Sequence, residues 1–198
     1  MLEEKKDMIY LTIANGMFQR YMGQDQSQKN YKRVGGFLTG LRASTKRIKD
    51  RDVRFLYVRL SDGDESISAQ TPMYGSAGPD ILRCLASAVR QDINVVSGTK
   101  VFIETYLRRK EDSQRTYTNA AVYAGQVKLD WTPLANGVPR EQALESLYEE
   151  IVAFIEKKGV EEAAPAPDDS ALEDMPEFEE PVQVKPDKNI WEQGLKTV

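Results

Sequence analysis

Two segments of the chain combine aromatic rings with cations at strand-like spacing. Residues 53–60 (VRFLYVRL) and 100–108 (KVFIETYLR) alternate these groups with aliphatic side chains. Because successive side chains of a strand point to opposite faces, each segment is expected to have an apolar face and a face of rings and cations. The second face would hold Phe55, Tyr57, Arg59, Phe102, Tyr106 and Arg108. Such a face suits stacking on unpaired bases and contact with phosphates, and the alternative is that the rings pack in a core.

Cations also gather in two polar stretches next to these segments. One stretch lies between residues 42 and 51, and the other between residues 108 and 115. Their Lys and Arg residues are Arg42, Lys46, Arg47, Lys49, Arg51, Arg108, Arg109, Lys110 and Arg115. Loops of this kind suit sequence-independent contacts with a phosphate backbone. The alternative is that the charges only keep exposed hairpins in solution.

The composition removes most enzyme classes. The chain has no histidine and one cysteine, Cys84, which excludes a Ser-His-Asp triad, a Cys-His pair and a zinc site. It has no glycine-rich phosphate loop of the GxxxxGK[ST] or GxGxxG type. Asp62, Asp64 and Glu65 are close enough in sequence to be weighed as the magnesium ligands of a nuclease, but an Asp-Gly hairpin turn explains them more simply. We therefore expect no catalytic site, no metal and no cofactor, and we place Cys84 in a helical core.

The near-neutral net charge conceals an uneven distribution. Residues 20–128 contain 19 Lys and Arg against 11 Asp and Glu, whereas residues 159–182 contain nine acidic residues and no basic one. A basic body indicates a polyanionic partner, with scattered solvating charges as the alternative. No apolar stretch is long enough to span a membrane and the first residues are charged, so we expect a cytoplasmic protein.

The order of predicted elements favours a mainly β protein built on a five-stranded OB-fold barrel. A hairpin with an Asn15–Gly16 turn comes first, followed by a polar loop over residues 24–30. Three strands, a helix from Gly78 and two more strands follow, with Gly35 and Gly36 bending the first strand. The predicted units are an N-terminal hairpin and loop (1–30), an OB-fold domain (31–131), an amphipathic helix (138–159) and an acidic disordered tail with a short docking segment (160–198). The amphipathic helix either docks on the domain or pairs with a second copy, which leaves a homo-oligomer open.

Four segments carry a resemblance to a known family: residues 36–41 (GFLTGL), residues 55–63 (FLYVRLSDG), the helix from Gly78 and residues 101–106 (VFIETY). The arrangement resembles the OB-fold single-stranded DNA-binding proteins, in particular phage-like replication proteins with an acidic C-terminal tail. The resemblance implies sequence-tolerant binding of single-stranded DNA in DNA replication or recombination, in the host cytoplasm if the chain is encoded by a bacteriophage. It also implies that the tail competes with DNA for the basic groove and recruits replication proteins.

Within the tail, residues 174–178 (DMPEF) resemble the acidic, proline-containing tip that ends in phenylalanine in bacterial relatives. Here the stretch is internal, so a terminal carboxylate cannot take part in its recognition. The residues expected to bind a partner are Asp174, Met175, Pro176, Phe178 and Trp191. A plain acidic linker is the alternative for the tail, and an OB-fold adaptor that binds proteins but no nucleic acid is the alternative for the whole chain.

Overall fold

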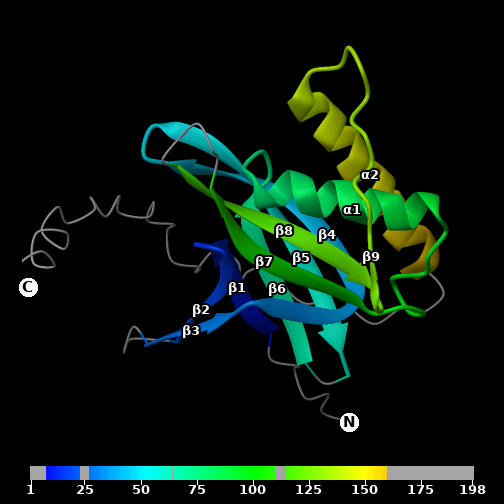
Figure 1. The fold of residues 1–198 in the computed structure, drawn as a ribbon, viewed down its shortest axis with the longest axis horizontal. Coiled ribbons are helices and arrows are strands. Elements are labelled where there is room, and N and C mark those ends of the chain that lie inside the picture. The colour runs from blue at the N-terminus through cyan, green and yellow to red at the C-terminus, as the bar shows by residue number, and fades with distance from the viewer. Residues whose placement is uncertain (1–7, 23–26, 64, 110–114, 160–198) are drawn as a thin grey trace, which may run out of the picture.

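A computed structural model describes residues 8–22, 27–63, 65–109 and 115–159. This part of the chain is mainly β, with two helices (Figure 1). The elements are β1 (Met8–Ala14), β2 (Met17–Met22), β3 (Ser27–Tyr31), β4 (Arg33–Ile48), β5 (Arg51–Asp62), β6 (Glu65–Pro72), α1 (Ala77–Arg90), β7 (Val101–Arg109), β8 (Thr116–Ala124), β9 (Val127–Lys128) and α2 (Arg140–Gly159). The predicted mainly β class and both predicted helices are confirmed.

The described strands form one mixed sheet in the order β3-β2-β1-β6-β5-β4-β7-β8-β9. The long strand β4 joins the two halves of this sheet, because residues 37–48 pair with β5 and residues 33–36 pair with β7. At the change of partner, Gly36 lies so close to β5 that an added Cβ would be 2.7 Å from the carbonyl oxygen of Ser61. The two glycines where the sequence predicted a bulge or bend therefore mark the change of partner, and Gly36 is required by the close approach of two backbones. The irregularity in the register of β4 with β5 lies further on, between Leu38 and Gly40.

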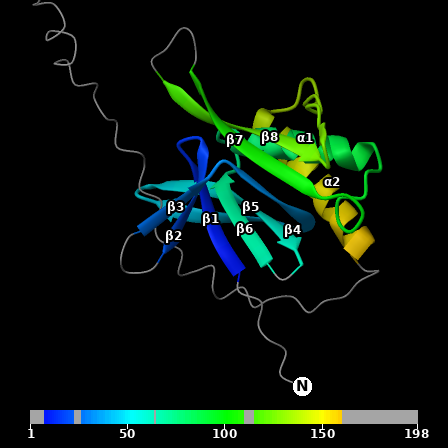
Figure 2. The same ribbon diagram turned by 60° about the horizontal axis from the view of Figure 1, so that its bottom comes forward.

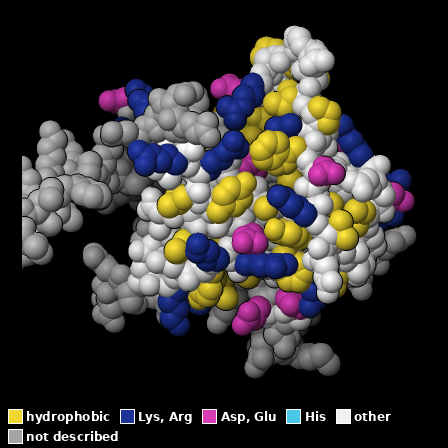
Figure 3. Space-filling model, in the orientation of Figure 1, with side chains coloured by type: hydrophobic (Ala, Val, Ile, Leu, Met, Phe, Trp, Pro, Cys, Tyr) yellow, Lys and Arg dark blue, Asp and Glu magenta, His cyan; other side chains and the backbone are white. Residues whose placement is uncertain are grey.

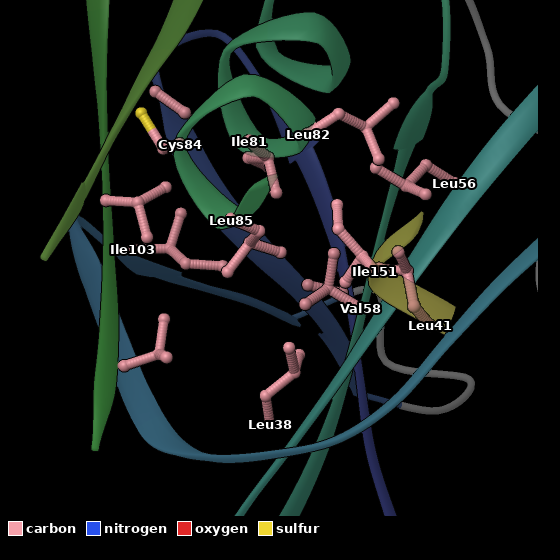
Figure 4. Close-up of a cluster of buried hydrophobic side chains, with 14 of the residues drawn as sticks. Leu38, Leu41, Leu56, Val58, Ile81, Leu82, Cys84, Leu85, Ile103 and Ile151 are labelled. Atoms are coloured by element: carbon pink, nitrogen blue, oxygen red, sulfur yellow. The ribbon is translucent and has the colours of Figure 1, made fainter. Parts of the chain in front are cut away.

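The two halves face each other across the main hydrophobic core. Figure 2 shows β7 and β8 on one side, β1, β6 and β5 on the other, and the helices beside them. Figure 4 shows Leu38, Val58, Leu85 and Ile103 converging from β4, β5, α1 and β7. Cys84 on α1 belongs to this core as a buried free thiol, as its helical spacing predicted. α2 adds Ile151 to the core and packs on α1 and β4, so its apolar face is used within the chain.

The predicted closed five-stranded barrel is wrong, because the sheet is open. Within the sheet, the five strands concerned are ordered β6-β5-β4-β7-β8, so closure would require β6 to pair with β8. The free edge of β6 is instead occupied by β1, which pairs with it in parallel over residues 8–12 and 66–70. The N-terminal hairpin therefore takes the position that barrel closure needs.

Side chains replace a neighbouring strand along part of the β8 edge. The carboxylate of Asp80, in the first turn of α1, accepts hydrogen bonds from the backbone N–H of Ala120 (3.0 Å) and from the Asn119 side chain (2.8 Å). The hydroxyl of Thr118 accepts the N–H of Gly16 (3.0 Å), and its carbonyl oxygen accepts the hydroxyl of Ser76. These contacts satisfy backbone groups that would otherwise pair with a strand.

Two local predictions also need correction. The polar loop expected over residues 24–30 contains β3, which pairs with β2 from Phe18↔Tyr31 to Met22↔Ser27. The cation-rich stretch between residues 42 and 51, which was expected to be a loop, is mostly strand, because β4 continues to Ile48, β5 begins at Arg51, and only Lys49 and Asp50 form the turn. In both places pairing with a neighbouring strand overrides a composition that is typical of loops. None of the described helices is long and apolar enough to cross a membrane.

Candidate nucleic-acid interface

The β4–β5 hairpin brings several of the predicted binding residues together. In its antiparallel register, Arg42 pairs with Tyr57 and Ser44 pairs with Phe55, so these side chains lie on one face. The ammonium group of Lys46 lies 5.9 Å from the centre of the Tyr57 ring on the same face. Cations and rings are therefore adjacent here, as the alternation along residues 53–60 predicted.

The prediction that Phe55 and Tyr57 are exposed for stacking is wrong. Their exposed fractions are 1% and 2%, and they form a small second core with Tyr10, Ile48 and Val53. The N-terminal hairpin contributes to this burial, because Tyr10 lies on β1, the strand that pairs with β6. Arg59, two residues after Tyr57 on the same face, is half-buried.

Polar groups without partners lie beside the buried rings. Gln70 pairs with Tyr57 across β5 and β6, and its amide nitrogen donates a 3.0 Å hydrogen bond to the Thr12 hydroxyl. The Tyr57 hydroxyl, the Gln70 amide oxygen and the Ser68 hydroxyl are buried with no hydrogen-bond partner among the described residues. This face therefore offers buried polar groups bordered by cations rather than exposed stacking platforms.

Exposed rings lie instead on the outer face of β7 and β8. Tyr106 is 37% exposed and Tyr117 is 39% exposed. Arg108 is exposed and pairs with Tyr117 across the hairpin, while Tyr106 pairs with Asn119. Figure 3, which views the molecule from this side, shows hydrophobic side chains interleaved with Lys and Arg. The sequence identified Tyr106 and Arg108, but it missed Tyr117 because the strand register across the 110–114 loop was not readable from the sequence.

A stack of rings and a guanidinium occupies the other end of this face. The Arg33 guanidinium carbon lies 4.5 Å from the centre of the Phe102 ring and 5.1 Å from that of Tyr123. Phe102 is half-buried and lies directly over Gly35, where an added Cβ would be 2.3 Å from the ring. The structure therefore covers the predicted stacking ring Phe102 on two sides. Arg33 and Tyr123 were missed because their proximity depends on the pairing of β4 with β7 and of β7 with β8.

The remaining predicted cations lie at two hairpin tips that project from the same side of the molecule (Figures 1 and 2). The exposed cations at or near these tips are Arg47, Lys49 and Arg51 on β4–β5, and Arg108, Arg109 and Arg115 on β7–β8. Lys110 and the predicted partner-binding residues Asp174, Met175, Pro176, Phe178 and Trp191 lie outside the described residues. The tips thus concentrate positive charge on one side of the sheet.

Other cations are held in ion pairs within the fold. Arg54 on β5 pairs with Glu145 on α2 at 2.5 Å, and the Tyr74 hydroxyl donates to the same carboxylate. Burial, together with the hydrogen bond to Glu145, raises the pKa of Tyr74 to about 12. The hydrogen bond to Glu145 likewise raises the pKa of Arg54, so the guanidinium stays charged. This cluster fastens α2 to the sheet.

The acidic residues near Asp62 do not assemble a metal site in the described part of the chain. Asp62 forms a 2.7 Å ion pair with Lys100, and no group of three or more acidic, cysteine or histidine residues among those described is placed to hold a metal ion. No family model, curated protein or solved structure matches the chain. The case for its function therefore depends on the geometry of its own residues.

Proposed function

We propose that this chain binds single-stranded DNA with little sequence preference and acts in DNA replication or recombination of the bacteriophage type. One observation carries the proposal: Tyr106 and Tyr117 are exposed on the β7–β8 face beside the exposed cation Arg108, at the end of the strands that leads to the cationic tip. Exposed rings can stack on any base, and cations can contact any phosphate, so the combination favours binding that tolerates many sequences. The protein would work in the cytoplasm, that of the host if the chain is phage-encoded.

We further propose that the fold is an OB-type fold opened by its N-terminal hairpin. The support is the sheet order β6-β5-β4-β7-β8, with α1 following the third of these strands in sequence. Single strands commonly bind OB folds at a sheet face and at the adjacent hairpin loops. The two cationic hairpin tips and the β7–β8 face would supply these elements here.

The rings and the cations contribute in different ways. A base stacked on an aromatic side chain is worth about 1–3 kcal/mol, so loss of Tyr106 or Tyr117 should weaken binding about 5- to 150-fold. Each phosphate contact steepens the salt dependence, with a slope of log K against log salt of about −0.7 per contact for a single strand. Ring variants should therefore change affinity with little change in slope, whereas cation variants should change both.

The acidic segment 160–182 would act as a competitor and as a recruiting arm. Its acidic residues complement the cationic tips in charge, and residues 174–178 together with Trp191 would contact replication proteins. Removing everything after Gly159 should therefore tighten DNA binding, most clearly at low salt. The truncation removes no part of the described core.

The test is fluorescence anisotropy of a labelled oligo-dT with the full chain, the chain ending at Gly159, and the variants Tyr106→Ala and Tyr117→Ala. Trp131→Ala is the matched control, because Trp131 is 44% exposed but lies in the connection between β9 and α2. We expect salt-sensitive binding that tightens on truncation, weakens in both tyrosine variants and is unchanged in the control. Failure of the full and shortened chains to bind at low salt would refute the proposal.

A protein-binding adaptor is the second candidate, and one observation favours it. Val127 is 68% exposed and Trp131 is 44% exposed, and the two lie close in sequence. Val127 is on β9, which pairs with the end of β8 away from the hairpin tip. Exposed apolar side chains of this kind suit a protein partner, including a second copy of the chain. Analytical ultracentrifugation of the wild type and Trp131→Ala would show whether these residues mediate self-association.

A further inference from the structure

The Arg33 guanidinium is held in place by rings, yet its N–H groups bind nothing in the described structure. It packs on Phe102 and Tyr123 at 4.5 and 5.1 Å, and it makes no hydrogen bond or ion pair with another described residue. A guanidinium fixed against aromatic rings loses less conformational freedom when it binds an anion than one on a mobile side chain. Arg33 is therefore preorganised for an anionic ligand.

Gly35 is what permits this arrangement. Phe102 pairs with Gly35 across β4 and β7, and the absence of a side chain there lets the ring lie against the backbone. An alanine would place its Cβ 2.3 Å from the nearest ring atom, which would displace Phe102 and with it the surface that supports Arg33. The support is therefore specific to this pair of strands.

Arg83 provides an internal comparison. Its guanidinium also lies over a ring, 4.8 Å from the centre of Trp131, but its Nε donates a 2.8 Å hydrogen bond to the carbonyl oxygen of Thr132. Arg83 thus fastens the connection after β9 to α1. Arg33 lies at similar distances from its two rings, and its donors bind no other described residue, so they are available for a ligand.

We propose that Arg33 is a phosphate anchor for the bound single strand, at the end of the β7–β8 face away from the hairpin tips. The proposal rests on the proposed function and extends the site beyond the residues identified there. A planar guanidinium with paired donors matches the oxygens of a phosphodiester. The site would take the nucleic-acid backbone and would not distinguish one base from another.

The register sets the length of the site. Arg33 pairs with Glu104, and Arg108 lies four residues further along β7, which corresponds to about 13 Å at 3.3 Å per residue. Tyr106 lies between these two cations, and Tyr117 lies opposite Arg108. A strand bound along β7 would thus have a cation at each end, with Tyr106 between them and Tyr117 beside Arg108. A short oligonucleotide held at the tips would not reach Arg33.

Substitution of Glu104 provides a second test of the same site. It is the cross-strand partner of Arg33 and is half-buried on the same face, so its charge should repel a phosphate bound to Arg33. Glu104→Gln should therefore tighten binding of a long strand, an effect opposite to that of losing Arg33. A role of Arg33 in stability alone predicts no such gain.

The experiment compares Arg33→Gln, Arg33→Lys, Glu104→Gln and the control Arg83→Gln in anisotropy titrations with a long and a short oligo-dT over a range of salt concentrations. We expect Arg33→Gln to weaken binding of the long strand about tenfold and to reduce its salt slope by about 0.7, with little effect on the short one. Arg33→Lys should retain part of the affinity, because it keeps the charge and loses the planar donors. Arg83→Gln should leave affinity and slope unchanged.

Thermal unfolding of each variant separates binding from folding. Wild-type affinity and slope in folded Arg33→Gln, while Tyr106→Ala weakens binding, would overturn the anchor and leave the proposed function intact. Equal losses for long and short strands would also overturn it, because the anchor lies beyond the reach of the short one. No binding by the wild type would overturn both proposals. If Arg33→Gln does not fold, Arg33→Lys and Glu104→Gln still test the anchor. Unchanged or weaker binding of the long strand by Glu104→Gln would then contradict it.

Discussion

Asp80 should be one of the most stabilising polar residues of the fold, because it satisfies the sheet edge that barrel closure would have covered. Its carboxylate accepts the backbone N–H of Ala120 at 3.0 Å and the side-chain amide of Asn119 at 2.8 Å. Asp80 is itself buried and lies in the first turn of α1, where a negative charge interacts favourably with the helix dipole. Asp80→Ala removes all of these contributions together.

The expected loss of stability in Asp80→Ala can be worked out from the hydrogen-bond donors that lose their acceptor. Ala120 is 1% exposed, so its N–H would have no access to water, and an orphaned buried donor costs about 1–3 kcal/mol. Asn119 is only half-buried, so its amide can find water and contributes less. With a helix-dipole contribution of about 0.3–1 kcal/mol, the free energy of unfolding should fall by roughly 2–4 kcal/mol. For a domain of this size, that lowers Tm by roughly 5–15 °C.

Urea denaturation and calorimetry measure the loss, and amide hydrogen exchange localises it. Asp130→Ala is the control. Asp130 is an exposed aspartate shortly after β9, so its loss should change the free energy of unfolding by less than about 0.5 kcal/mol. Asp80→Asn, which keeps an acceptor oxygen but loses the charge, should fall between the control and Asp80→Ala. The reasoning is refuted if Asp80→Ala costs no more than the control, or if the Ala120 amide remains as protected as in the wild type.

Three further predictions concern a buried hydroxyl, a half-buried phenol and a buried thiol. Tyr57→Phe removes a buried hydroxyl that has no partner among the described residues, so urea denaturation should show unchanged or slightly higher stability. Because the pKa of Tyr74 is raised from 10.0 to about 12, chiefly by burial and then by its hydrogen bond to Glu145, folding favours the protonated phenol. The stability that the protonated Tyr74 gives the folded state is fully present below pH 10 and is lost as the pH rises towards 12. Between pH 10 and pH 12, the Tm of Tyr74→Phe should therefore fall less steeply than that of the wild type. Burial raises the pKa of the Cys84 thiol to about 11, so labelling by a disulfide reagent near pH 8 should be slow and should accelerate on unfolding; rapid labelling of the native chain would contradict this.

Local patterns in the sequence predicted those parts of the fold that depend on neighbouring residues. The apolar spacing of α1 and α2 and the Asn15–Gly16 turn are each encoded within a few positions. Asn15 and Gly16 have φ of 51° and 71°, which suits the two-residue hairpin turn that their types indicated. Each of these features was therefore readable before any long-range pairing was known.

Long-range pairing accounts for what the sequence did not reveal. β3 has the polar composition SQKNY and no alternation of apolar residues, so its strand conformation depends on β2. The parallel contact of β1 with β6 joins segments more than fifty residues apart and has no local signal. The same is true of the stack of Arg33 on Phe102, which needs β4 to leave β5 and pair with β7.

The position of the N-terminal hairpin links the error in the fold to the error in the candidate site. By pairing with β6, β1 keeps the sheet from closing, and it also brings Tyr10 against the small core of Phe55 and Tyr57. Among the described residues, no strand is added over the outer face of β7 and β8, and Tyr106 and Tyr117 remain exposed there. The alternation of rings and cations was the same in both strands, and the fold gave one strand a structural role while leaving the other available for binding. It follows that replacing Phe55 should mainly reduce stability, whereas replacing Tyr106 should reduce DNA affinity with little change in stability. Melting and binding measurements on these two variants test whether the two strands differ in this way.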